Sequence, residues 1–143
     1  MKTRCFACEA DPTRWARTCY DHLAGTVGVR LTDALLPEGL VEPGCQELTC
    51  DGERWLGNFG IDVERLRRKR RAFLRPRLDW SERRDHLAGA VAASMTRILL
   101  ERRWIVRVPD SRAVRVTPRG SDKLNRLAGL DLTAPAVAVS RVD

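Results

Sequence analysis

A string of five residues, Asp-His-Leu-Ala-Gly, occurs twice in this chain, at residues 21–25 and at residues 85–89. When the two strings are aligned, residues 21–42 and 85–106 agree at nine of 22 positions. A shorter match lies further along the chain at a slightly larger offset, so the second copy contains a small insertion. The chain is therefore an internal duplication, and we expect each copy to form one supersecondary unit that buries its apolar face against the other.

Apolar residues recur every four positions after each repeated string. They are Leu23, Val27, Leu31 and Leu35 in the first copy, and Leu87, Val91, Met95 and Leu99 in the second. This spacing predicts one apolar stripe on a helix in each copy, and we expect the two stripes to face each other. Asp21 and Asp85 are then predicted to lie in the first helical turn, where a carboxylate meets the positive end of the helix dipole.

A hairpin and a second helix are predicted to follow in each copy. The hairpins would turn near residues 43–44 and 109–111, because both stretches combine proline with residues that favour turns. The second helices are predicted over about 50–59 and 118–127. A threonine precedes each of these helices and is placed to cap it.

Each copy resembles part of a winged-helix unit. A helix followed by residues 39–41, a hairpin and residues 48–52 (Leu-Thr-x-x-Gly) is similar to the last helix and wing of winged-helix regulators, which lay a recognition helix in the major groove. Only about ten residues separate Gly25 from Leu35, too few for the additional helix and turn of a complete helix-turn-helix. We therefore predict a helix-rich α+β fold, a tandem duplication of a winged-helix-like unit (helix, β-hairpin, helix) that serves packing more than base reading.

The chain of 143 residues fits one domain or two closely packed half-domains. We divide it into an N-terminal segment that could bind metal (1–15), a first repeat (16–62), a basic linker (63–84), a second repeat (85–131) and a tail (132–143). Five cysteines without a signal peptide or a long apolar run predict a soluble, cytoplasmic protein with no membrane partner. No glycine-rich phosphate loop, serine elbow or catalytic triad is present in the sequence, so we expect no enzyme.

Longer strings resemble the C-terminal region of a group of ArsR/SmtB-type bacterial transcriptional regulators. They are residues 16–25, 60–62, 78–84, 86–89, 111–113 and 117–120, so the resemblance extends over roughly residues 16–131. In that group an N-terminal winged-helix domain binds DNA, and the region similar to this chain follows it. The resemblance implies transcriptional regulation, with this chain as the effector-sensing or dimerising module without that N-terminal domain. A homodimer or a complex with a partner regulator protein is then expected.

Four residues near the N-terminus have the spacing of a zinc site. Cys5, Cys8, Cys19 and His22 spell C-x2-C-x10-C-x2-H, in which each short turn brings two ligands to one tetrahedral Zn²⁺. Two other interpretations stay open: Cys19 and His22 pack structurally while Cys5 and Cys8 lie on a loose terminus, or the thiols sense redox state. The alternative function is accordingly a small zinc-binding protein that acts through protein contacts without binding DNA.

The two histidines of the chain, His22 and His86, occupy equivalent repeat positions. This equivalence is compatible with a ligand or proton site shared across a pseudo-twofold axis. Duplication alone would also copy a histidine that only hydrogen-bonds a neighbouring carbonyl, and the sequence leaves both possibilities open.

Basic residues gather in one segment of a chain whose formal net charge is +7. Eight lie within thirteen positions: Arg65, Arg67, Arg68, Lys69, Arg70, Arg71, Arg75 and Arg77. Such a cluster could contact successive phosphates and bind DNA with salt-sensitive, sequence-independent affinity. A solvated charged segment, partly paired with nearby carboxylates, would have the same composition.

Overall fold

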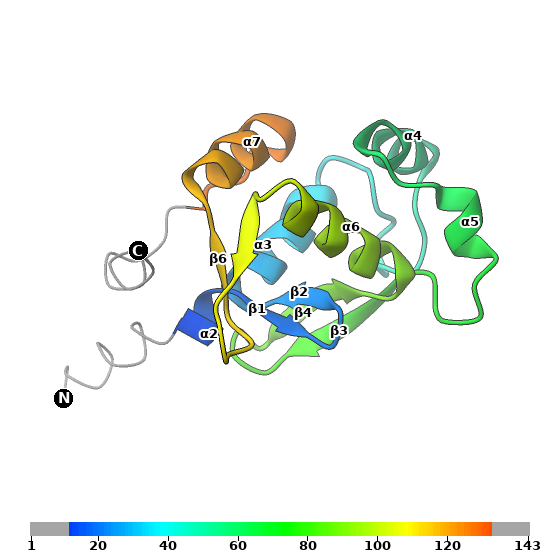
Figure 1. The fold of residues 1–143 in the computed structure, drawn as a ribbon. Coiled ribbons are helices and arrows are strands. Elements are labelled where there is room, and N and C mark those ends of the chain that lie inside the picture. The colour runs from blue at the N-terminus through cyan, green and yellow to red at the C-terminus, as the bar shows by residue number, and fades with distance from the viewer. Residues whose placement is uncertain (1–11, 133–143) are drawn as a thin grey trace.

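The computed structural model describes residues 12–132, and the fold of these residues is α+β, as predicted. Two central helices lie against two antiparallel hairpins, with further helices at the edges (Figure 1). The helices are α2 (Pro12–Trp15), α3 (Gly25–Leu35), α4 (Cys50–Phe59), α5 (Val63–Arg67), α6 (Ala90–Glu101) and α7 (Pro118–Ala128). The strands are β1 (Arg17–Cys19), β2 (His22–Ala24), β3 (Arg75–Asp79), β4 (Arg84–Ala88), β5 (Ile105–Arg107) and β6 (Val114–Val116).

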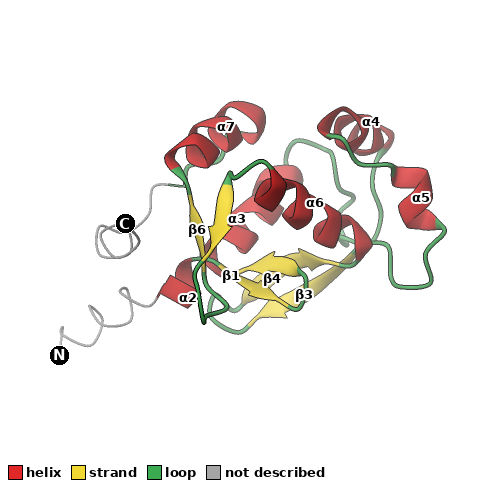
Figure 2. Ribbon diagram, viewed as in Figure 1, coloured by secondary structure: helices red, strands yellow, loops and turns green. Residues whose placement is uncertain are grey.

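The strands form three separate two-stranded antiparallel sheets, β1–β2, β3–β4 and β5–β6 (Figure 2). The first hairpin turns through only two residues, Tyr20 and Asp21, so that Cys19 lies opposite His22. Tyr20 adopts a φ of 61°, the positive value that tight two-residue hairpin turns require. An isolated bridge from Arg17 to Ala113 joins the first hairpin to the chain that leads into β6.

The repeated string forms a strand and a turn, so the prediction that a helix begins at Asp21 and Asp85 is wrong. Asp21 lies in the turn before β2, and Asp85 lies within β4. The chain changes from strand to helix at the glycine of each string, where φ is 82° for Gly25 and 96° for Gly89. A Cβ atom at either glycine would lie 2.9 Å from a backbone oxygen, so the close approach also favours glycine.

The two apolar stripes meet in one core, which confirms that part of the prediction. All eight stripe residues are buried in a single hydrophobic cluster. α3 packs mainly on β4, whereas α6 packs mainly on β2, so the helix of each copy covers the strand of the other (Figure 1). The two copies therefore share one interior.

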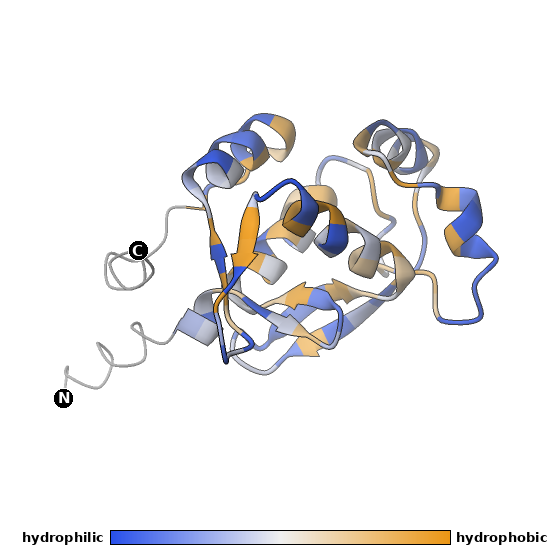
Figure 3. Cartoon of the chain, in the orientation of Figure 1, coloured by the Kyte–Doolittle hydropathy of each residue, from blue (hydrophilic) through white to orange (hydrophobic). Residues whose placement is uncertain are grey.

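The outer parts of the two copies differ in extent. In the second copy, β5 and β6 form the predicted hairpin, but in the first copy the hairpin is reduced to one isolated bridge between Val41 and Leu48. The predicted second helices are confirmed as α4 and α7. The side chains of Thr49 and Thr117 cap them, each accepting a hydrogen bond from the backbone N–H three residues later, at 3.0 and 2.9 Å. In Figure 3, β5 is hydrophobic, whereas much of α7 is hydrophilic.

The segment expected as a basic linker, residues 63–84, contains α5 and β3 and contributes Leu66 and Leu74 to the core. Residues 1–11, which include Cys5 and Cys8, and residues 133–143 lie outside the described part of the chain. Among residues 12–132, no helix combines the length and apolarity that a membrane crossing requires.

Candidate functional site

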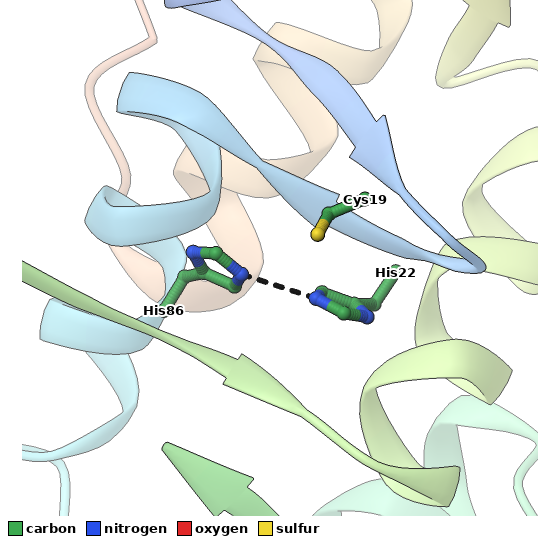
Figure 4. Close-up of side chains that lie close together, drawn as sticks. All are labelled: Cys19, His22 and His86. Atoms are coloured by element: carbon green, nitrogen blue, oxygen red, sulfur yellow. Dashed lines mark hydrogen bonds between the residues drawn. The ribbon is translucent and has the colours of Figure 1, made fainter. Parts of the chain in front are cut away.

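His22 and His86 meet where the two copies join. β2 and β4 carry them toward each other, and their Nε2 atoms lie 3.0 Å apart (Figure 4). The ring centroids are 5.0 Å apart and the ring planes are tilted by 37°. The two rings therefore meet at their Nε2 edges and do not stack. Both residues are almost completely buried, with 3% and 1% of their surface exposed. The equivalence of the two histidines in the repeat thus corresponds to a direct contact in space.

Cys19 joins the two histidines because the tight β1–β2 hairpin places it directly opposite His22. One ligand atom from each of Cys19, His22 and His86 lies within 4.8 Å of the other two, and Figure 4 shows the thiol beside the two rings. The structure therefore brings together Cys19 and His22, as the zinc prediction required, and adds His86. Cys5 and Cys8 fall outside the described residues, so their part in that prediction stays untested.

Asp79, at the end of β3, is the centre of a buried polar network beside the histidine pair. Its Oδ1 atom accepts hydrogen bonds from the guanidinium of Arg17 at 3.2 Å and from the hydroxyl of Ser81 at 2.6 Å. Its Oδ2 atom accepts the backbone N–H of Gly25 at 2.7 Å. Asp79 is completely buried and Arg17 almost so. This carboxylate therefore joins the β3–β4 turn to the start of α3.

A carboxylate faces the outer nitrogen of each histidine. Oδ2 of Asp79 lies 2.9 Å from Nδ1 of His86, although the contact is not aligned well enough to count as a hydrogen bond. Oδ1 of Asp21 lies 3.7 Å from Nδ1 of His22. Carboxylates at these positions favour the tautomer that carries its proton on Nδ1. The 3.0 Å hydrogen bond between the two Nε2 atoms, however, requires that one ring carry its proton on Nε2 and donate it to the lone pair of the other.

The histidines are held neutral near pH 7. Burial, and then the neighbouring His86, lower the pKa of His22 to about 4. Burial likewise lowers the pKa of His86, against the opposing effect of Asp79. For Asp79, burial alone would raise the pKa, but hydrogen bonds from Ser81 and Gly25 and the charge of Arg17 outweigh it and lower the pKa. The site therefore combines two neutral imidazoles with one ionised carboxylate.

These shifts predict acid sensitivity of the chelator-treated protein. Because the folded-state pKa of His22 is below its unfolded value of about 6.5, the unfolded chain binds the proton first as pH falls. The free energy of unfolding should fall between pH 6.5 and about 4, by up to about 1.4 kcal/mol per pH unit for each histidine. Urea denaturation across this range measures the slope, and His22→Asn should make it shallower. A flat profile in the wild type would contradict the prediction.

Two surface clefts are lined by residues of the cluster. Cys19 and His86 line a cleft of about 640 Å³. His22 lines a second cleft, of about 470 Å³. Tyr20 and Arg77 line both clefts, and Tyr20 is 84% exposed. Small solutes can thus approach ligand atoms whose residues are otherwise buried.

Two of the eight residues of the basic segment form ion pairs with carboxylates from other parts of the chain. Arg67 pairs with Glu47 at 2.8 Å and also with Glu53, and Arg71 pairs with Asp21 at 2.6 Å. The other six residues are exposed: Arg65, Arg68, Lys69, Arg70, Arg75 and Arg77. They lie on α5, on the following loop and on β3 instead of on one continuous helix. The nucleic-acid prediction is untested, but Arg67 and Arg71 already have carboxylate partners.

Sequence reasoning missed the buried network of Arg17 and Asp79. Both residues lie in strings that carry the family resemblance, yet no spacing or periodicity marks a buried ion pair between positions 62 residues apart. Arg17 also stacks over the exposed ring of Trp80, with 4.3 Å between the guanidinium carbon and the ring centroid. Only the fold, which brings β1 and the end of β3 together, reveals these contacts.

Comparison with known proteins finds similarity to an uncharacterized HTH-type transcriptional regulator, YdfF, of Bacillus subtilis (strain 168). The two sequences are 45% identical over 114 residues, which amount to 78% of this chain and 50% of the relative. The chain thus spans about half the length of the relative it matches. No family model matches the chain, and no solved structure matches it. The similarity supports a role in the regulation of transcription.

Proposed function

We propose that this chain is the effector-sensing and dimerising module of an ArsR-type transcriptional regulator. The observation that carries the proposal is the 45% identity to an HTH-type regulator over most of the chain. The cluster of Cys19, His22 and His86 supports the sensing role, because it lies between the two copies and is reached through two clefts. An effector bound there would contact both halves of the module.

The packing of the central helices argues against direct base reading by them. Eight of the twelve residues of α6 are buried, and α3 is covered similarly by the strands of the other copy. A recognition helix must present one face to the major groove. In this fold α3 and α6 present their apolar faces to the core, which supports a role in sensing and assembly over base reading by these helices.

An apolar patch supports the dimerising role. Three large hydrophobic side chains are exposed on the first two hairpins: Tyr20 is 84% exposed, Leu78 67% and Trp80 60%. Aromatic residues are enriched in the buried centres of protein interfaces, where arginine is also common. Arg77, which lies over the Tyr20 ring, adds this second component. The patch would suit a second copy of the chain or a partner regulator.

Direct contact with DNA is a further element of the proposal. The exposed basic residues of the 65–77 segment would supply phosphate contacts independent of sequence, adding affinity to a regulator whose base reading lies elsewhere. The alternative, a small zinc-binding protein that acts only through protein contacts, predicts no association with DNA in the cell or in solution.

Chromatin immunoprecipitation of the full chain, tagged in its own host, tests the function. We expect enrichment at promoter regions and altered transcription of the adjacent genes when the gene is deleted. Replacing Arg65, Arg68, Lys69 and Arg70 together with serine should reduce DNA retention in solution and flatten the salt dependence, by up to about 0.9 in log–log slope for each phosphate that the protein no longer neutralises. The matched control replaces four exposed arginines elsewhere: Arg54, Arg97, Arg119 and Arg126. The absence of both promoter enrichment and any transcriptional change on deletion would contradict the proposed function.

A further inference from the structure

We propose that Cys19, His22 and His86 together bind one thiophilic transition-metal cation of the Zn²⁺ class at the junction of the two copies. This ligand set differs from the N-terminal cysteine pattern because it includes a histidine from the second repeat. The metal site itself requires no regulatory role.

The distances suit a single ion. In a tetrahedral zinc site with Zn–N near 2.0 Å and Zn–S near 2.3 Å, two nitrogens lie roughly 3.3 Å apart and a nitrogen and a sulfur roughly 3.6 Å apart. Here the two Nε2 atoms are 3.0 Å apart, and all three ligand atoms lie within 4.8 Å of one another. Small side-chain rotations would therefore place the three atoms around one cation.

The surroundings of the histidines give an independent indication. Histidines that bind metals usually direct the other ring nitrogen to a carboxylate or a carbonyl, which fixes the tautomer and orientation of the ring. Asp79 faces Nδ1 of His86 at 2.9 Å, and Asp21 faces Nδ1 of His22 at 3.7 Å. When both rings carry their proton on Nδ1, both Nε2 atoms offer lone pairs to the same point. A cation between them would displace the proton of the Nε2–Nε2 hydrogen bond and replace that bond by two coordinate bonds.

The donor set selects the class of metal. One thiolate and two imidazoles favour zinc and copper, whereas magnesium and calcium prefer oxygen ligands. The two clefts give a cation access to the cluster and leave room for a water molecule or another exogenous ligand in the fourth position. Three protein ligands with one open position are typical of sites that exchange ligands.

Arg77 holds the strand position that corresponds, in the second copy, to that of Cys19. In the β1–β2 register Cys19 is opposite His22, and in the β3–β4 register Arg77 is opposite His86. Residues directly opposite in antiparallel strands point to the same face. The positive charge of Arg77 therefore weakens cation binding, and Arg77→Cys would supply a second thiolate at the symmetric position.

Metal titration of the full, reduced, chelator-treated chain tests the site. We expect one equivalent of Zn²⁺ to bind in competition with a chromophoric chelator, and Co²⁺ to give the visible absorption of a tetrahedral complex with a thiolate-to-cobalt band. Saturating zinc, at about 100 times its dissociation constant, should raise the melting temperature by roughly 5–10 °C. Failure of the wild-type chain to bind zinc or cobalt would overturn the proposal.

Variants separate this ligand set from the N-terminal one. Removing a group that hydrogen-bonds to a metal ligand typically weakens metal affinity 10–100-fold. His86→Asn and Cys19→Ser remove the ligands themselves, so each should weaken zinc affinity by at least roughly 100-fold. Cys50→Ser, which removes an exposed thiol, should change nothing, and the double variant Cys5→Ser, Cys8→Ser should retain binding. Loss of zinc in that double variant together with full retention in His86→Asn would overturn the proposal.

A gain of affinity provides a test that misfolding cannot imitate. Arg77→Cys should bind zinc at least about 10-fold more tightly than the wild type, because it removes a charge and adds a thiolate. Circular dichroism would establish that each variant is folded before titration. An unchanged or weaker affinity in a folded Arg77→Cys protein would contradict the geometry. Promoter enrichment does not depend on these results, so failure of the metal site leaves the proposed function separately testable.

Discussion

Replacing Asp79 with alanine is expected to lower the free energy of unfolding by about 3–5 kcal/mol, the range for breaking a buried ion pair. The carboxylate is completely buried and accepts hydrogen bonds from Arg17, Gly25 and Ser81. Its removal would leave the buried Arg17 guanidinium without its carboxylate partner and the Gly25 N–H at the start of α3 without an acceptor. Urea denaturation with circular dichroism measures the loss.

The control for Asp79 is an aspartate whose ion pair is exposed. Asp122 pairs with Arg126 on α7 at 3.4 Å, and both side chains are largely exposed. Exposed pairs of this kind contribute little, so Asp122→Ala should change stability by less than about 0.5 kcal/mol. Equal effects of the two substitutions would show that the buried network does not hold the hairpins to α3.

Gly52→Ala is expected to destabilise the protein by about 3 kcal/mol, at the upper end of the usual range for overpacking. A Cβ atom at Gly52 would lie 1.9 Å from the backbone oxygen of Leu40. The obstacle is a backbone atom, so no side-chain rotation can relieve it, and α4 would have to move. The second copy repeats this arrangement, since a Cβ at Gly120 would lie 2.0 Å from the backbone oxygen of Trp104.

The same substitution five residues later in the same helix is the matched control. Gly57 is exposed on α4, and a Cβ atom there would meet nothing within 4 Å. Alanine is a better helix former than glycine, so Gly57→Ala should stabilise the protein by about 0.5–1 kcal/mol. If Gly52→Ala were also neutral or stabilising, the close packing of α4 on the chain at Leu40 would be refuted.

Much of the fold could be predicted because the duplication and the helix signals are local. The four-residue apolar stripes identified the shared core, and Thr49 and Thr117 marked the starts of α4 and α7. The strands of the repeated string were missed because His22–Ala24 is short and buried throughout, without the alternation of polar and apolar residues that identifies a half-buried strand. A stripe that included Leu23 therefore resembled an additional helical turn.

The candidate site was only partly predictable for a related reason. The repeat related His22 to His86, but their contact depends on how the two hairpins pack, which no spacing in the sequence encodes. The C-x2-H pattern placed Cys19 beside His22 correctly, since a two-residue turn lies between them. The arginine cluster could not reveal that Arg67 and Arg71 are paired with carboxylates from distant segments, Glu47 and Asp21 among them.

X-ray absorption spectroscopy at the zinc edge of the full, zinc-loaded chain tests the central claim most directly, because it counts the sulfur and nitrogen ligands around the ion. The two copies should share one ion, so we expect one sulfur near 2.3 Å and light-atom ligands near 2.0–2.1 Å, with the multiple scattering of two imidazoles. In His86→Asn the two-imidazole signal should be lost. A shell of three sulfurs with one imidazole would assign the ion to Cys5, Cys8, Cys19 and His22 and contradict a site shared between the copies.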